Sequence, residues 1–338
     1  MLSWGLRIAT TNERFIVSRI RNKNILVTGG AGFIGSHLVD QLILHDPKRL
    51  VVVDNFFLGQ DQNLINARQN SSSLEIMRLD ATDISSMRHV VRKLDIDFVF
   101  DLAIVPLPLS FEFPDWTIKT NIGVATTFCE LLRNEEVDEM LHFSSSEVYG
   151  TAHSVPMFED HPHNAITPYA ASKSGADSII NSYISTFGIE VRTVRPFNNF
   201  GTRQNAGSYA GVIPIVVKKI MDNEPIVIYG DGQQTRDFIY VKETVKAVVD
   251  IFNSAESSKK TLNLGTGKET SINELVSRIV GILGKPNYQI VYEERRPGDV
   301  DRHCAGMTKT SEILGYTPDP LNDDQLSATI DWYMRTLG

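Results

Sequence analysis

Thr28-Gly-Gly-Ala-Gly-Phe-Ile-Gly35 is the stretch of this sequence that decides its fold. A short apolar run, residues 24–28, leads into it, and a segment of helical hydrophobic periodicity, residues 33–45, follows it. The glycine spacing is typical of a strand-to-helix turn that lets a pyrophosphate approach the backbone and the helix N-terminus. A glycine-rich turn can also serve only to reverse the chain. Here the strand before it, the helix after it and Asp54, which ends the next apolar run, favour dinucleotide binding.

Apolar runs of strand length alternate with helical patterns through more than half of the chain. The runs lie at residues 24–28, 50–54, 74–79, 98–102, 140–143 and 190–195, and the helical patterns at 33–45, 84–93, 115–132 and 167–187. Strands that alternate with helices form βαβ units, in which helices cover both faces of a parallel sheet. We therefore predict an α/β fold with a Rossmann-type doubly wound parallel sheet.

The rhythm changes after Pro196, where Asn, Gly, Thr and Gln residues predict a loop over residues 198–208. Helical patterns follow at residues 211–222, 241–252, 271–283 and 324–336, with short strands between them. We predict a smaller C-terminal α/β substrate domain over the strand ends, where ligands of open α/β sheets bind. The predicted boundaries are 23–195 for the dinucleotide domain, with 237–265 returning to it, 196–236 and 266–338 for the substrate domain, and 1–22 for an N-terminal extension.

The charge balance limits the partners that the chain can have. Its 338 residues include 33 Lys and Arg against 41 Asp and Glu, a net charge of −8. A nucleic-acid partner is not expected, because neutralising phosphates needs a basic surface. The chain has only two cysteines and no apolar run near the roughly 18 residues of a membrane span, and residues 1–21 carry charges. These features predict a cytoplasmic protein without a membrane partner. Any anionic ligand must then be held locally, by a few arginines or backbone N–H groups.

Asp54 also bears on which dinucleotide binds. A carboxylate at the end of the second strand accepts a hydrogen bond from the adenosine ribose 2′-hydroxyl and repels a 2′-phosphate, so the sequence favours NAD over NADP. A P-loop is excluded, because Gly267-Lys268 is followed by Glu269 where that motif needs Ser or Thr. The eight histidines and two cysteines show no zinc spacing, so no metal site is predicted.

Tyr169-Ala-Ala-Ser-Lys173 lies at the start of the helix predicted over residues 167–187. The i, i+4 spacing puts the phenol and the ammonium on one helix face, where the positive charge favours the phenolate. Tyr169 can then exchange a proton with a substrate hydroxyl while hydride moves to or from a nicotinamide. An exposed pair of side chains on a helix has the same spacing, and serines at residues 144–146 also suit a turn. Ser145 favours the catalytic interpretation, because it follows a strand at the sheet edge where ligands bind.

Seven stretches of the sequence, in this order, resemble the extended short-chain dehydrogenase/reductase family of nucleotide-sugar epimerases, dehydratases and decarboxylases. They are TGGAGFIGSHLV (28–39), SSSEVYG (144–150), PYAASK (168–173), RPFNNFG (195–201), YGDGQQTRDFIYV (229–241), LNLGTGKETSINEL (262–275) and RRPGD (295–299). They extend through nearly the whole chain beyond residue 23. The resemblance implies NAD, a nucleotide-sugar substrate and a homodimer built on the helices at 115–132 and 167–187.

The resemblance also implies roles for individual residues. Ser145, Tyr169 and Lys173 correspond to the family's catalytic trio. The residues that match its cofactor contacts are Gly29, Gly32, Phe33, Ile34, Gly35, Asp54, Asn55, Asp80, Ala81, Leu102, Ala103, Asn121, Tyr169, Lys173 and Phe197. The residues that match its contacts to the substrate's diphosphate and ribose are Asn198, Arg236, Arg296 and Asp299. Two arginines can chelate a diphosphate without a net positive charge, although an arginine taken alone is more often a surface residue.

The reaction is predicted from the residues that follow Ser145. Family members share hydride transfer from a sugar carbon, usually C4, to NAD, which gives a 4-keto sugar. A 4,6-dehydratase then needs a base for the C5 proton, and Glu147 occupies the place of the dehydratase carboxylate, next to Ser146 where many dehydratases have Asp. Glu147 can alternatively be a buried structural acid. We predict an NDP-hexose 4,6-dehydratase with Ser145, Ser146 and Glu147 as catalytic residues beside Tyr169 and Lys173.

Other activities stay open at this point. A 4-epimerase of the UDP-glucose or UDP-GlcNAc type is the alternative, and a UDP-glucuronate decarboxylase is the third candidate. A non-catalytic NAD-binding scaffold belongs to a different class, and such relatives typically lack the tyrosine or the lysine that this chain has. The loop over residues 104–110 reads Ile-Val-Pro-Leu-Pro-Leu-Ser and is unusually apolar where the family faces the sugar, so neither the sugar nor its nucleotide is predicted.

Overall fold

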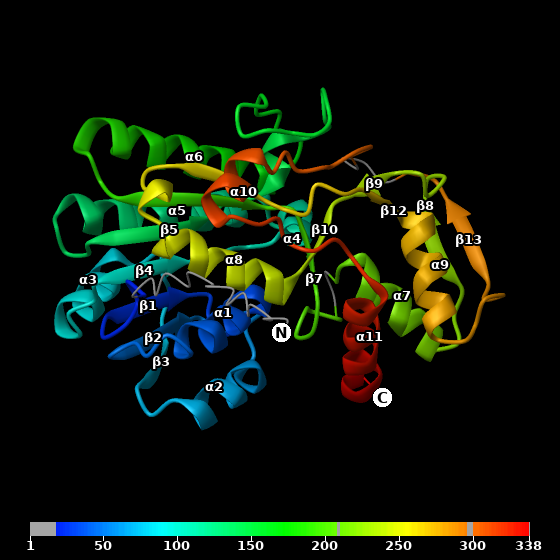
Figure 1. The fold of residues 1–338 in the computed structure, drawn as a ribbon, viewed down its shortest axis with the longest axis horizontal. Coiled ribbons are helices and arrows are strands. Elements are labelled where there is room, and N and C mark those ends of the chain that lie inside the picture. Colours follow the sequence, from blue (N-terminus) through cyan, green and yellow to red (C-terminus); the bar gives the residue numbers. More distant parts are fainter. Residues whose placement is uncertain (1–17, 208–209, 296–299, 338) are drawn as a thin grey trace, which may run out of the picture.

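The computed structural model describes residues 18–207, 210–295 and 300–337, and its centre is a seven-stranded parallel sheet (Figure 1). The sheet has the order β11-β6-β5-β4-β1-β2-β3. Its strands are β1 (Asn24–Thr28), β2 (Arg49–Asp54), β3 (Leu74–Arg78), β4 (Phe98–Asp101), β5 (Glu139–Phe143), β6 (Val191–Pro196) and β11 (Thr261–Leu264). The predicted doubly wound sheet is confirmed, and the order reverses between β1 and β4, which opens a crevice at the carboxyl ends of the strands.

Helices cover both faces of this sheet (Figure 1). On one face, α1 (Phe33–Ile43) and α8 (Val241–Asn253) share a hydrophobic core with Val27 of β1. On the other face, the core that includes Leu26 is closed by α3 (Ile84–Lys93), α5 (Pro114–Arg133) and α6 (Pro168–Phe187). Successive residues of β1 therefore enter opposite cores, and the whole strand is buried, as a sheet covered on both sides requires.

The C-terminal part has a hydrophobic core of its own, which contains Ile213, Val276 and Ile330. Its elements are α7 (Val212–Met221), β8 (Ile226–Tyr229), β9 (Thr235–Arg236), β12 (Thr270–Ser271), α9 (Ile272–Ile282), β13 (Ile290–Glu293) and α11 (Asp323–Leu337). β8 pairs with β13 and β9 with β12, while a short parallel pair, β7 (Asn198–Phe200) and β10 (Phe238–Tyr240), links this part to the main sheet region. In Figure 1 these elements lie beyond the ends of the central strands.

Short helices account for most differences from the prediction. The loop predicted over residues 104–110 contains the start of α4 (Leu107–Glu112), with Pro106 at its N-cap and Pro108 in its first turn. Proline is tolerated there because the first turn needs no N–H donors. The other short helices that periodicity did not predict are α2 (Ile65–Asn70), α10 (Thr308–Leu314), η1 (Asp61–Leu64), η2 (Ser146–Tyr149) and η3 (Ala255–Ser257). Helices of one or two turns are too short to establish a hydrophobic period.

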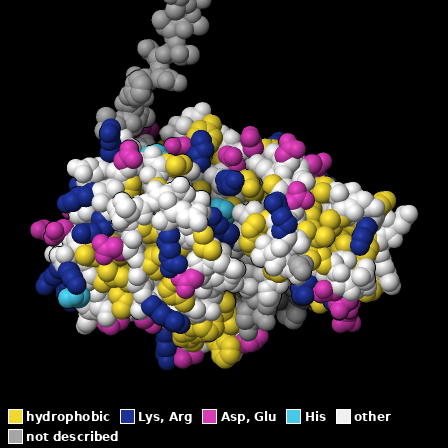
Figure 2. Space-filling model, turned by 90° about the horizontal axis from the view of Figure 1, so that it is seen from below, with side chains coloured by type: hydrophobic (Ala, Val, Ile, Leu, Met, Phe, Trp, Pro, Cys, Tyr) yellow, Lys and Arg dark blue, Asp and Glu magenta, His cyan; other side chains and the backbone are white. Residues whose placement is uncertain are grey.

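The described end of the predicted N-terminal extension packs on the sheet domain. The backbone N–H of Arg19 donates to Asn253 at 2.8 Å, and its guanidinium pairs with Glu139. Ile20 is fully buried in the core beneath α8. None of the helices in the described ranges combines the length and apolar character that crossing a membrane requires. On the face shown in Figure 2, basic and acidic side chains are interspersed and form no continuous basic surface.

Candidate active site

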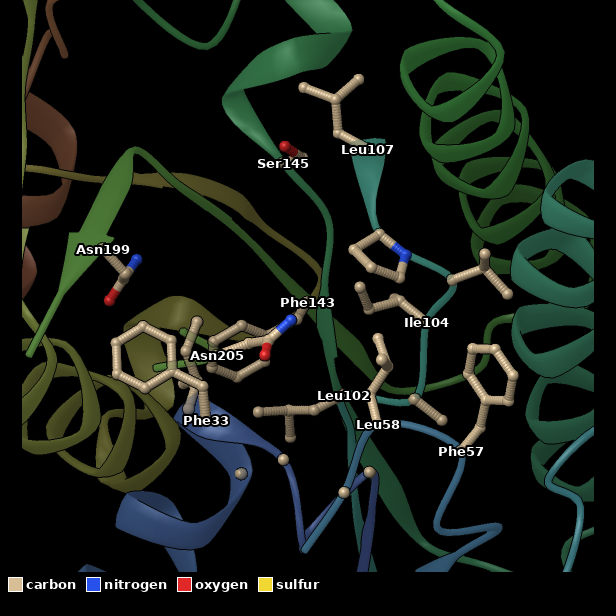
Figure 3. Close-up of a pocket in the computed structure, with 18 of the residues that line it drawn as sticks. Phe33, Phe57, Leu58, Leu102, Ile104, Leu107, Phe143, Ser145, Asn199 and Asn205 are labelled. Carbon is tan, nitrogen blue, oxygen red and sulfur yellow. The ribbon is translucent and has the colours of Figure 1, made fainter. Parts of the chain in front are cut away.

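A cavity of about 480 Å³ lies at the carboxyl ends of the main strands, within the usual range for ligand pockets. Its walls come from the turn before α1, the segments that follow β2, β3, β4 and β5, the helix α5, the start of α6, and residues within 196–205 and 210–211. Figure 3 shows Phe33 of α1 near Asn205 on one side, and Ser145 with Leu107 at one end. This is the switch point of the strand order, where the sequence predicts the ligand site.

The glycine turn forms one end of the cavity. Gly29 has a φ of +64°, in the left-handed region that favours glycine. A Cβ at Gly35 would lie 2.2 Å from the carbonyl oxygen of Gly29, so only glycine allows α1 to approach the turn this closely. Gly32, the N-cap of α1, also lines the cavity. Because the first N–H groups of a helix have no partners within it, this end of the cavity fits a diphosphate.

Asp54 lies in the wall next to the glycine turn. Its Oδ2 accepts from the N–H of Ala31 at 3.0 Å and its Oδ1 from the N–H of Phe56 at 2.8 Å. Burial raises the pKa of this carboxyl, while the two backbone donors lower it. Each carboxylate oxygen can accept a second hydrogen bond, so the carboxylate is held by the backbone and still fits a ribose hydroxyl. The turn and Asp54 together suit a dinucleotide.

Ser145, Tyr169 and Lys173 line the other end of the cavity. Thr167, the N-cap of α6, accepts a backbone N–H of the first turn at 3.1 Å and fixes the start of the helix that carries Tyr169. Ser145 lies directly after β5 at the N-cap of η2. Burial raises the pKa of Tyr169 to about 12, whereas its hydrogen bond with Ser145 lowers it and the charge of Glu147 raises it. The Ser145 hydroxyl and the Glu147 carboxylate thus act on the pKa of the phenol in opposite directions.

Lys173 is only 2% exposed, and its Nζ donates to the carbonyl of Phe143 at 2.6 Å. Burial lowers the pKa of the ammonium to about 8, while the charges of Asp101 and Asp177 raise it. The predicted pair on one face of α6 is thus present. In this structure the ammonium is hydrogen-bonded to the end of β5, and the phenol to Ser145.

Glu147 and Ser146, both predicted as catalytic residues, also line the cavity. The Glu147 side chain is half-buried, and its backbone N–H donates to the Oγ of Ser145 at 3.2 Å. Because its charge raises the pKa of Tyr169, the two groups are electrostatic neighbours. A carboxylate therefore lies beside the predicted proton acceptor, where a second proton transfer can take place.

Most of the predicted site residues that the structure describes meet in this one cavity. Those that line it are Gly29, Gly32, Phe33, Ile34, Gly35, Asp54, Asn55, Asp80, Ala81, Leu102, Ala103, Ser145, Ser146, Glu147, Tyr169, Lys173, Phe197 and Asn198. Arg296 and Asp299 lie outside the described residues.

Asn121 and Arg236 are not among the residues that line the cavity. The Asn121 side chain is 1% exposed and binds the backbone of Val105. Its amide oxygen accepts from the Val105 N–H at 2.7 Å, and its amide nitrogen donates to the Val105 carbonyl at 3.1 Å. Asn121 therefore shapes the wall segment after β4. Arg236 donates to the carbonyls of Thr235 and Val300 and so supports the backbone next to residues 296–299.

Two features of the cavity were not predicted. The mouth is aromatic: Phe57 is 56% exposed, and its ring meets that of Trp116 edge to face with centroids 4.9 Å apart. Arg203 also lines the cavity, pairs with Asp40 of α1 at 2.7 Å, and keeps a buried Nη1 without a hydrogen-bond partner in the described part of the chain. A basic residue in the loop that follows a strand end was the available signal for Arg203.

The residues that the structure describes contain no group of three or more His, Cys, Asp or Glu side chains that could hold a metal ion. His161 and His303 are instead buried near Tyr149 and Phe197. Both cysteines are buried and free.

The sequence matches the family model described as GDP-mannose 4,6 dehydratase over residues 26–326. With the glycine turn, the Ser-Tyr-Lys arrangement and the parallel sheet in place, this match defines the class. The chain belongs to the extended short-chain dehydrogenase/reductase family, among its nucleotide-sugar epimerases and dehydratases.

Similar proteins in this family carry different activities. The chain is 33% identical to a putative UDP-glucose 4-epimerase of Methanocaldococcus jannaschii, over 91% of this chain and 97% of the relative. A UDP-N-acetylglucosamine 4-epimerase from Methanobrevibacter ruminantium, solved in complex with UDP-N-acetylmuramic acid, superposes with a TM-score of 0.86 at 34% identity, over 93% of this chain and 99% of that one. A dTDP-glucose 4,6-dehydratase from Streptomyces venezuelae, solved with NAD, superposes with a TM-score of 0.85 at 27% identity, over 93% and 97%.

Proposed function

We propose that this protein is an NAD-dependent enzyme that converts a nucleotide sugar through a 4-keto intermediate, and that its reaction is the 4,6-dehydration of an NDP-hexose. The observation that carries the proposal is the meeting of Ser145, Glu147, Tyr169 and Lys173 at one end of a cavity whose other end is a glycine turn. The cofactor is NAD: Asp54 stands where a 2′-phosphate would be repelled, and the similar dehydratase was solved with NAD.

The first step oxidises the sugar at C4. NAD, when bound, supplies the acceptor for the C4 hydride. Tyr169 takes the proton of the C4 hydroxyl, and Ser145, hydrogen-bonded to the phenol, holds that hydroxyl in place. The Lys173 ammonium lies one turn further along α6 and stabilises the phenolate that accepts the proton.

Glu147 supports dehydration as the second step. The ketone at C4 acidifies the C5 proton, and the Glu147 carboxylate takes it. The same carboxyl group then gives a proton to the C6 hydroxyl, which leaves as water. Return of the hydride to C6 and of a proton to C5 completes the 4-keto-6-deoxy product. The charge of the Glu147 carboxylate raises the pKa of Tyr169, as expected of a carboxylate close to the phenol.

Epimerisation at C4 is the second candidate, and the apolar wall favours it. An epimerase turns the 4-keto sugar over before the hydride returns, which is easiest where few hydrogen bonds hold the ring. Ile104, Val105, Pro106 and Leu107 line the cavity without polar side chains. Two of the similar proteins described above are 4-epimerases, one of them putative. Decarboxylation of a uronic-acid sugar is the third candidate.

The substrate's diphosphate is proposed to lie near Asn198, with Arg203 beside it, because both line the cavity and Arg203 has a buried donor. Arg236, Arg296 and Asp299 remain proposed substrate contacts by resemblance. The homodimer on α5 and α6 is likewise a proposal.

A panel of UDP-, dTDP-, GDP- and CDP-sugars in D2O, followed by NMR and mass spectrometry, tests the reaction. Dehydration gives loss of the C6 hydroxyl with solvent deuterium at C5. Inverted C4 without solvent deuterium overturns dehydration in favour of epimerisation, and loss of CO2 from a uronic-acid sugar favours decarboxylation. Glu147→Gln should abolish dehydration, whereas Glu274→Gln, an exposed residue in the first turn of α9, should not.

Tyr169→Phe separates an enzyme from a scaffold. The phenol is the proposed proton acceptor, so this variant should lose at least a hundredfold in kcat with NAD binding retained. Unchanged turnover in Tyr169→Phe would overturn the catalytic assignment.

A further inference from the structure

A row of buried polar residues crosses four neighbouring strands beneath α5 and α6. The register pairs Thr28 of β1 with Asp101 of β4, Asp101 with His142 of β5, and His142 with Thr193 of β6. All four side chains are at most 3% exposed. Because side chains alternate along a strand, the row lies on one face of the sheet, where the neighbouring positions are apolar. A carboxylate in such a place needs partners.

Asp101 has a partner for each oxygen. The hydroxyl of Thr28 donates to Oδ1 at 2.7 Å, and the Nδ1–H of His142 donates to Oδ2 at 2.7 Å. These hydrogen bonds and the charges nearby hold the pKa of Asp101 below its usual range in spite of its burial. Thr28 in turn accepts from the N–H groups of Leu102 and Ala103, both at 3.0 Å, so the carboxylate is fixed relative to two walls of the cavity.

Lys173 of α6 lies over this row, because its Nζ donates at 2.6 Å to the carbonyl of Phe143, the residue that follows His142 in β5. Asp101 and Asp177 are the two carboxylates that raise the pKa of its ammonium. Asp177, however, forms a buried ion pair with Arg195 at 2.8 Å. In the described part of the chain Asp101 is hydrogen-bonded to Thr28 and His142 and pairs with no lysine or arginine, so no permanent cation already neutralises it.

We infer that Asp101 is a positioning residue for the proposed reaction: a buried counterion beneath α6 that keeps Lys173 protonated, while the hydrogen bond from His142 keeps Asp101 ionised. The inference rests on the proposed role of Lys173 as the stabiliser of the Tyr169 phenolate. Asp101 and His142 do not line the cavity, so neither touches substrate or cofactor.

The His142 ring is held by Asp101 through Nδ1, and its Nε2 is buried without a hydrogen-bond partner in the described ranges. The titratable groups that face Asp101 from the packed elements are His142 on β5, Cys129 on α5, and Lys173 on α6. Burial and the charge of Asp101 raise the pKa of Cys129 to about 12, so the thiol is neutral and Lys173 is the cation beside Asp101.

Asp101→Asn tests the inference because it removes the charge and keeps the shape. The amide oxygen can accept from Thr28, and the amide N–H can donate to the other tautomer of His142. We expect the pKa of Lys173 to fall by one unit or more, as measured by NMR of 13C-labelled lysine in the cofactor-free protein, with the signal assigned by Lys173→Arg. In turnover, the basic limb of the kcat profile should move to lower pH by the same amount, with unchanged KM. A one-unit fall from about 8 lowers kcat about twofold near pH 7 and about fivefold near pH 8.

Thr193→Val is the matched control, since it changes the same row on the far side of His142 without altering charge. It should leave both the Lys173 pKa and the pH profile as in the wild type. If Asp101→Asn does not fold, His142→Leu serves instead: it removes a donor from the carboxylate, so Asp101 gains a proton at higher pH and the Lys173 pKa falls in the same direction.

A merely structural role predicts a lower Tm with an unchanged Lys173 pKa, and that result in a folded variant overturns the inference. The NMR titration needs no turnover. If the protein converted none of the nucleotide sugars, the proposed function would be overturned. The titration would still support or overturn the role of Asp101 as the counterion of Lys173.

Discussion

Replacing Gly35 with alanine should weaken NAD binding about a hundredfold. The added Cβ would lie 2.2 Å from the Gly29 carbonyl oxygen and 2.9 Å from the Gly29 carbonyl carbon and the Gly30 Cα. All three are backbone atoms of one turn, so no side chain can rotate away, and α1 must move off the turn by about 1 Å to reach an ordinary contact. Such a shift misplaces the N–H groups that receive the diphosphate. Losing one or two hydrogen bonds to a charged group costs about 3 kcal/mol, which is roughly a hundredfold in Kd.

Gly281→Ala is the control, because Gly281 is also within a helix and a Cβ there meets nothing within 4 Å. Alanine at this exposed position should raise stability by about 0.5–1 kcal/mol and leave NAD affinity unchanged. Isothermal titration with NAD measures both variants, and circular dichroism confirms that each is folded. A folded Gly35→Ala protein that binds NAD within twofold of the wild type would refute this reasoning about the turn.

Three further outcomes are expected. Arg203→Gln should weaken nucleotide-sugar binding about tenfold in titration calorimetry while NAD affinity stays the same; equal affinity for the sugar nucleotide would remove Arg203 from the site. Burial lowers the pKa of His37 and of His303 to about 4, so the unfolded chain binds more protons between about pH 4 and 6.5, and stability is lost as the pH falls through that window. Urea unfolding should show about 2 kcal/mol of loss per histidine between about pH 7 and pH 5, and a shallower loss in His303→Gln. Light scattering should give the mass of a dimer that Phe187→Glu, at an exposed site on α6, converts to a monomer, and a monomeric wild type would contradict the family expectation.

Six of the seven strands of the sheet could be predicted from the sequence because each carries its own local signal, whereas β11 was expected only within residues 237–265 that return to this domain. The run 24–28, for example, is apolar throughout and enters a glycine turn, and the structure has β1 at those residues. α4 lacks such a signal. Its residues Leu107–Glu112 follow one proline and include another, and one turn and a half cannot display a helical period. The sequence therefore predicts a loop for this segment.

The candidate site likewise contains residues that the sequence reveals and residues whose place only the fold reveals. Tyr169 and Lys173 are visible in the sequence because helical spacing alone puts them on one face. The place of Asn121 depends on contacts that spacing does not reveal, since its amide is taken by Val105 and by Ser172 of another helix. The pairing of Asp101 with His142 depends on the register between two strands, which only the folded sheet defines.

The two ends of the cavity use different kinds of recognition, and this bears on what the enzyme can accept. At the glycine turn the ligand meets backbone N–H groups, whose position is set by glycines that a Cβ would disrupt, so this end tolerates little change in either protein or ligand. At the proposed sugar end, Ile104 and Leu107 line the cavity with apolar side chains. An apolar wall discriminates weakly between sugars that differ by a hydroxyl, because it leaves no buried polar group unpaired. We therefore propose that polar groups of the cavity select the sugar, and that Glu147, which lines it with Ser145 and Tyr169, decides what happens to the 4-keto form.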